Sequence, residues 1–190
     1  KDLKAVVTEL HVDPHHAALL LETAAQAGLL AQGSDAEGGA VWLPTHAFDT
    51  WSAQTAAERW LTLARTWSVS PRLPGLVGTK DAAGKTRNAL APDAASVFVS
   101  EARQSMLREL AALGEGECLA TGTGLPSLVE RLAWLRPRRP ATRAEMIGWA
   151  ATEAAALGLT GLDAAASYLQ PFLDGDHEAC VEALEPLLPT

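Results

Sequence analysis

The chain has 190 residues, with 23 acidic and 15 basic side chains and a formal net charge of −8. This length fits one domain or two small ones, and an apolar fraction of 48% is enough for a buried core. The negative balance argues against a surface that coats DNA everywhere, because phosphates attract net positive charge. A local basic patch is still compatible with it.

The two cysteines, Cys118 and Cys180, have no metal-site spacing and predict a cytoplasmic chain with free thiols. No apolar run approaches the roughly 18 residues of a membrane span, and no signal peptide is visible. The chain lacks an initiator Met, so we expect an excised segment of a longer protein.

One pattern occurs twice. A short helix, a turn and a longer apolar helix end on Ala-Ala-x-x-Gly-Leu, first at residues 24–29 and again at residues 154–159. Asp13 and Pro14 predict the start of the first long helix, because aspartate caps a helix and proline fits its first position. Two helices joined by a tight turn are typical of a helix-turn-helix.

Turn-forming residues at 33–39 and an apolar run at 40–43 predict a hairpin after the first pair of helices. Helix, turn, helix and hairpin is the order of a winged helix, whose usual first helix and strand would lie before residue 1. The sequence therefore predicts a first winged-helix-like module with trailing helices over residues 1–70.

Thr55 and Glu58 form a capping-box pair before a helix that Pro71 ends. The three prolines of residues 71–92 predict a proline-rich connector, either a linker or an ordered crossing loop. A helix is expected over residues 93–113, followed by a Gly/Thr-rich loop over 114–124.

The second module is predicted over residues 93–190, with Thr142 and Glu145 as another capping box and short closing helices at 164–173 and 178–184. The predicted fold class is mainly α, with tandem winged-helix-like modules and short β-hairpins.

Two motifs resemble ligand sites. Residues 84–86 read Gly-Lys-Thr like a phosphate loop, but Thr79 stands where that motif needs glycine, so we predict a polar turn. His11, Asp13, His15 and His16 are close in sequence, but His15 and His16 would point about 100° apart and Asp13 would cap the helix. We therefore predict no metal site, no cofactor and no small-molecule ligand.

The six tryptophans could offer surfaces on which bases stack, but in small helical proteins they more often brace the core. We predict a core role for them: Trp42, Trp51, Trp60, Trp67, Trp134 and Trp149.

Charge is distributed unevenly in the second half. Thirteen residues hold five arginines and no acid, whereas residues 145–190 hold eight acids and no Lys or Arg. The arginines fall at the turn of the second helix-turn-helix, which in such proteins approaches the phosphate backbone. They are the predicted DNA contacts, unless they pair with the acidic tail: Arg131, Arg136, Arg138, Arg139 and Arg143.

The first long helix has no Lys or Arg between Asp13 and Gln32. Its polar residues His15, His16, Thr23 and Gln26 are weak readers of bases, so we predict that this face meets a protein partner.

Several segments resemble the helicase-associated proteins of high-GC bacteria, which are grouped with the N-terminal region of XPB-like helicases. The resemblance rests on residues 2–31, 41–51, 56–67, 129–140 and 150–161, including Trp42-Leu43-Pro44-Thr45, Glu58-Arg59-Trp60 and Arg136-Pro137. It implies a non-catalytic, winged-helix-bearing segment that associates with DNA or a helicase in transcription or DNA repair.

The sequence holds neither helicase ATPase motifs nor a nucleophile motif near its five histidines. We therefore predict a DNA-binding or DNA-positioning segment that is not an enzyme. The alternative is a protein-interaction module that docks a helicase or another transcription or repair partner.

Overall fold

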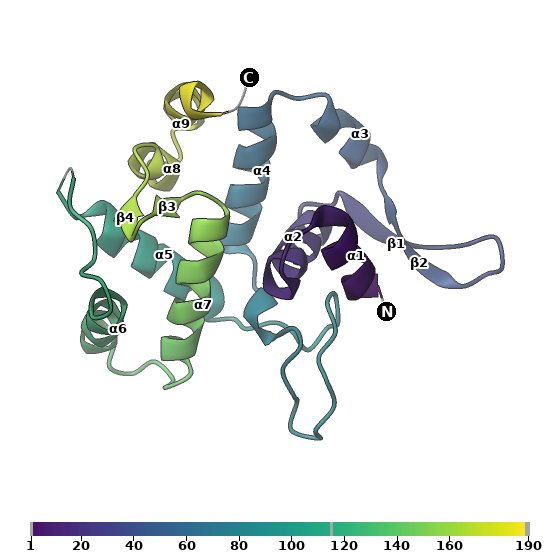
Figure 1. Ribbon diagram of the computed structural model, residues 1–190, viewed down its shortest axis with the longest axis horizontal. Coiled ribbons are helices and arrows are strands. Elements are labelled where there is room, and N and C mark those ends of the chain that lie inside the picture. Colours follow the sequence, from purple (N-terminus) through teal and green to yellow (C-terminus); the bar gives the residue numbers. More distant parts are fainter. Residues whose placement is uncertain (1, 115, 189–190) are drawn as a thin grey trace. The chain divides into compact units, whose positions relative to one another are not determined.

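Helices dominate the computed structural model, which describes residues 2–114 and 116–188 and includes two small antiparallel hairpins (Figure 1). The chain divides into two compact units, residues 1–94 and 95–190. Among the described residues, no helix is both long and apolar enough to cross a membrane. The expected mainly helical fold with short hairpins is confirmed.

Unit 1 contains two helices, a hairpin and two further helices. Its elements are α1 (Asp2–Leu10), α2 (Pro14–Gln26), β1 (Leu30–Ser34), β2 (Ala40–Pro44), α3 (His46–Ser52), α4 (Ala56–Val69) and the 3₁₀ turn η1 (Pro74–Leu76). α1, α4 and η1 all pack on α2. The β1–β2 hairpin extends away from these helices (Figure 1).

Unit 2 repeats that order after an additional helix. Its elements are α5 (Val99–Ala111), α6 (Gly124–Leu135), α7 (Arg143–Ala156), β3 (Thr160–Gly161), β4 (Ala164–Ala165), α8 (Leu169–Asp174), α9 (His177–Leu184) and η2 (Glu185–Leu187). α5 packs on α6, α7 and α8, so it forms the centre of this unit. Met106 and Leu107 of α5 are fully buried.

The repeated Ala-Ala-x-x-Gly-Leu segment ends α2 and α7 in the same way. Gly28 and Gly158 have φ values of +73° and +75°, which glycine adopts without steric cost. The N–H of each following leucine donates to the alanine four residues before the glycine, a Schellman arrangement. Leu29 and Leu159 are thereby turned into the core of their units.

Two of the three predicted helix N-terminal caps are present in the structure. Asp13 caps α2 through the N–H groups of His15 and His16, and the Thr55–Glu58 capping box is present at α4. The second predicted capping box is wrong, because Thr142 makes no side-chain capping bond. Backbone bonds from Arg143 and Ala144 already turn the chain helically at residues 140–142, so Thr142 is not extended as a capping residue must be.

The segment 71–92 belongs to unit 1. Its two ends are joined by Glu22 of α2, whose side chain is 1% exposed. Glu22 accepts hydrogen bonds from Arg72 at 2.7 and 3.0 Å and from the Leu90 N–H at 2.7 Å. The predicted connector is therefore an ordered loop closed at its base, and the units divide two residues later than expected.

Two predicted secondary structures and two predicted core residues are wrong. The helix expected from residue 93 begins at Val99, because the Ala94 carbonyl accepts a bond from the Leu73 N–H. The helix expected over 164–173 begins as strand β4. Trp67 is buried as predicted, but Trp42 and Trp134 are exposed.

Replacing Glu22 tests whether it closes the loop. Glu22→Ala leaves the Arg72 guanidinium and the Leu90 N–H without their buried acceptor, so we expect a loss of about 3–5 kcal/mol in unfolding free energy. Urea denaturation measures this loss, and Glu37→Ala in the exposed hairpin turn is the control. Equal stability of both variants would contradict the role given to Glu22.

Candidate nucleic-acid interface

The five predicted phosphate-contacting arginines lie around the connection between α6 and α7. We call residues 136–142 the arginine connection; Arg131 lies on α6 just before it, and Arg143 is the first residue of α7. Pro137 and Pro140 flank Arg138 and Arg139 and restrict the backbone there, since proline fixes φ.

Arg143 differs from the other four because only 4% of it is exposed. Its Nη1 donates to the Leu132 carbonyl at 2.9 Å, and its Nη2 donates to Glu101 of α5 at 3.1 Å. These bonds hold the end of α6 and the start of α7 together. A buried guanidinium with these partners does not reach a phosphate, so the predicted DNA contact at Arg143 does not fit the structure.

Glu101 also faces two arginines of the connection. Its oxygens lie 3.9 Å from Arg136 and 3.5 Å from Arg139, and the Arg139 guanidinium lies 5.4 Å from the centre of the Phe98 ring. Burial raises the pKa of Glu101, but a hydrogen bond from Ser105 and the charges of Arg143 and Arg139 outweigh it and lower the pKa. Glu101 is therefore a charged anchor at neutral pH.

The remaining two arginines differ in their partners. Arg131 pairs with Glu109 of α5. Arg138 makes no hydrogen bond or ion pair with any residue in the described part of the chain. Four of the five arginines thus face Glu101 or Glu109 of α5, and among the described residues none of the five pairs with the acidic tail.

Two hollows lie at this connection. A cavity of about 110 Å³ is lined by Arg136, Arg139 and Arg143 together with apolar residues of α6 and α7. An open depression of about 300 Å³ is lined by residues 135–139. Three arginines contribute to the lining of each hollow, and the lining of the cavity is otherwise apolar.

The predicted partner face on α2 is less accessible than its sequence suggests. Gln26 is exposed, His15 and His16 are half-buried, and Thr23 is buried at 4% exposure. Thr23 therefore does not lie on a surface that a partner could cover.

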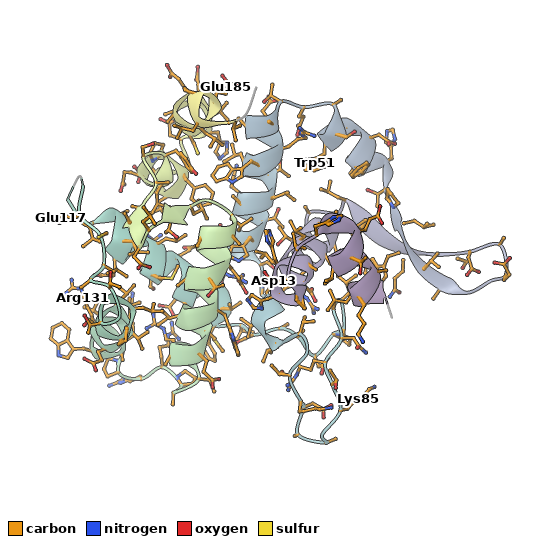
Figure 2. The ribbon with its side chains drawn as sticks, viewed as in Figure 1. Asp13, Trp51, Lys85, Glu117, Arg131 and Glu185 are labelled. Carbon is orange, nitrogen blue, oxygen red and sulfur yellow. The ribbon has the colours of Figure 1, made fainter. Side chains whose placement is uncertain are left out.

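The phosphate-loop-like segment is a turn, as predicted. The Asp81 carboxylate accepts hydrogen bonds from the Ala83 and Lys85 N–H groups at 2.9 and 2.8 Å. The N–H groups that would hold a phosphate in a true phosphate loop are therefore occupied by the protein itself. Lys85 lies near the tip of this loop (Figure 2).

The cluster at the start of α2 has its own structural role. Asp13 is engaged in capping α2, and its pKa is lowered by the hydrogen bonds from the backbone of His16 and His15. Within residues 2–114 and 116–188, no group of three or more His, Cys, Asp or Glu side chains is placed to hold a metal ion.

Comparison with known proteins gives no relative: no family model, no curated protein and no solved structure matches the chain.

Truncation of Arg143 and of Arg138 should affect the unfolding free energy to very different extents. Arg143→Ala removes a buried guanidinium that bonds α6 and α5, so we expect a loss of about 3–5 kcal/mol in unfolding free energy. Arg138→Ala removes an exposed side chain that has no partner among the described residues, and a change within about 0.5 kcal/mol is expected. Urea denaturation compares them; a large loss for Arg138→Ala would show a structural role that the contacts lack.

The lowered pKa of Glu101 makes its contribution depend on pH. Its stabilisation is present above the ordinary glutamate pKa and is lost as the pH falls through the lower folded pKa. The difference in unfolding free energy between wild type and Glu101→Gln should thus be constant from pH 7 to 5 and shrink toward pH 3. A difference that grows in acid would contradict the ionised anchor.

Proposed function

We propose that the chain is a non-catalytic nucleic-acid-binding segment that contacts phosphates through the arginine connection of unit 2 and Arg131. The observation that carries the proposal is the exposure of Arg131, Arg136, Arg138 and Arg139 around one short connection. Guanidinium groups match the geometry of phosphate oxygens, and Arg138 has no competing carboxylate in the described structure.

We further propose that each unit carries a winged-helix arrangement. The order α1, α2, β1, β2 in unit 1 and the order α6, α7, β3, β4 in unit 2 support this, with α5 as the first helix of the second module. In that arrangement the connection between the second and third helices lies where a helix-turn-helix approaches the phosphate backbone.

The exposed residues of α7 favour sequence-independent binding. A helix that reads bases needs side chains that donate or accept hydrogen bonds in the major groove. The exposed positions of α7 are mostly alanine, with Glu145 in the first turn and Thr152 further along. Glu145 would repel a phosphate, so backbone contacts through the arginines are favoured over base reading by α7.

The resemblance to helicase-associated proteins gives this activity a context. We propose that the segment positions DNA for a motor or a repair or transcription machine located elsewhere, in the cytoplasm of its cell. Glu101 and Glu109 face three of the four exposed arginines, which favours positioning of DNA over tight independent binding.

The second candidate function is docking of a protein partner through unit 1. Trp42 and Leu43 are exposed on the β1–β2 hairpin, and Leu10 is exposed at the end of α1. Exposed apolar residues of this kind mark protein-interaction sites more often than phosphate contacts. This function does not require the arginine connection.

Salt-dependent DNA binding tests the proposal. Neutralising phosphates releases counterions, so log affinity falls linearly with log salt. For the double variant Arg136→Ala/Arg138→Ala we expect weaker binding and a salt slope reduced by about 2. Fluorescence anisotropy with labelled DNA over a salt series measures both quantities.

The matched control removes two positive charges from unit 1, by Lys4→Ala/Lys85→Ala. It should leave the slope nearly unchanged if the contacts are local. Absence of binding by the wild type at low salt, or equal slopes for both double variants, would reject the proposed function and favour protein docking.

A further inference from the structure

Trp134 is exposed at the base of the arginine connection. It lies in the last turn of α6, and 76% of it is accessible to solvent. Leu128 and Leu132 form the buried face of this helix, and Trp134 is two residues beyond Leu132, which places it about 200° around the helix. The indole therefore points away from the core of unit 2.

Nothing in the described structure uses this side chain. Trp134 makes no ring contact, hydrogen bond or cation–π contact with the described residues. A tryptophan that is so exposed adds little to folding, because hydrophobic stabilisation scales with the area removed from water. Its position is thus explained better by a ligand than by the core role that the sequence suggested.

The neighbours of Trp134 carry both charges. Glu130 and Arg131 lie one turn earlier on the same side of α6, while Leu135, the next residue along the chain, begins the lining of the open depression of about 300 Å³. Arg136, Arg138 and Arg139 line the same depression. An exposed aromatic ring one residue before a depression lined by three arginines matches a ligand with flat rings and negative charges.

An exposed aromatic ring together with arginines favours unpaired over paired nucleic acid. In a duplex both faces of each base are stacked on neighbouring bases, so an indole on a protein surface finds no free face. An unpaired base has free faces, and aromatic side chains in basic grooves bind single strands by stacking. The alanine-rich exposed face of α7 offers no competing mode of duplex reading.

We propose that Trp134 and the arginine connection form a binding site for single-stranded nucleic acid. One base stacks on the indole of Trp134, while the neighbouring phosphates meet Arg136 and Arg138. This inference rests on the proposed function and adds its ligand class. It makes the segment a reader of unpaired strands with little dependence on sequence, because every base has a stacking face.

The test compares a labelled oligo-dT of 20 nucleotides with a labelled duplex of the same length, using the full chain and fluorescence anisotropy at low salt. We expect the wild type to bind the single strand more tightly. Trp134→Ala should weaken oligo-dT binding by about 5- to 150-fold and leave duplex binding within about twofold. Trp134→Phe keeps a stacking ring and should retain most of the affinity.

Trp42→Ala is the matched control, because Trp42 is also exposed but lies on the hairpin of unit 1. It should bind both ligands as the wild type does, and thermal unfolding should show that all variants fold alike. If Trp134→Ala binds oligo-dT like the wild type while Arg136→Ala/Arg138→Ala binds it weakly, the stacking site is rejected and the phosphate function stands. If the wild type binds neither nucleic acid, both proposals fail.

Discussion

Each unit depends on a carboxylate and a guanidinium that neutralise each other away from water. Glu22 and Arg72 form this pair in unit 1, and Glu153 and Arg103 form it in unit 2 at 2.8 Å. Taking an ion out of water costs several kcal/mol, so such a pair is tolerated only when the geometry satisfies both partners. The pairs therefore select one arrangement of the segments that carry them.

In unit 2 the buried ion pair also helps to fix the arginine connection, because α5 holds α7 in place. Arg103 of α5 fixes the third turn of α7 through Glu153, while Glu101 on the same helix holds Arg143 at the start of α7. Burial disfavours the charged form of Arg103 and lowers its pKa, whereas the charge of Glu153 opposes this. With α7 held at two points by one helix, the arginines before it are presented from a rigid support instead of a free loop.

Features that depend on neighbours in sequence could be predicted. The Asp13 cap, the Thr55–Glu58 capping box and the glycine-ended α2 and α7 each involve residues within one or two helical turns. The same local chemistry explains why the repeated Ala-Ala-x-x-Gly-Leu segment adopts the same hydrogen bonds twice. The spacing of apolar residues and the capping residues therefore predict where these helices begin and end.

Features that depend on a distant partner could not be predicted. Glu22 and Arg72 are 50 residues apart, and no sequence signal pairs them, so the sequence does not decide between a linker and the ordered loop that they close. Arg143 could not be told from Arg138, because both are arginines in the same basic run and only α5 distinguishes them. The hairpin turn at Leu162 and Asp163 was also hidden, because both residues have positive φ although neither is glycine.

The structure also changes what the charge of the sequence means. Five arginines without an acid in sequence suggest a strong positive field. In the structure, however, Arg143 is buried and paired with Glu101, and Glu101 and Glu109 face three of the other arginines. A field this local is screened within about 8–10 Å at physiological salt, and the chain as a whole repels phosphates with its charge of −8. Long-range steering therefore contributes little, and the proposed binding depends on contacts at close range. A stacking ring is such a contact, because its attraction to a base does not depend on net charge. In the proposed site, the exposed indole of Trp134 is therefore the group that adds affinity where the arginines are partly neutralised by Glu101 and Glu109.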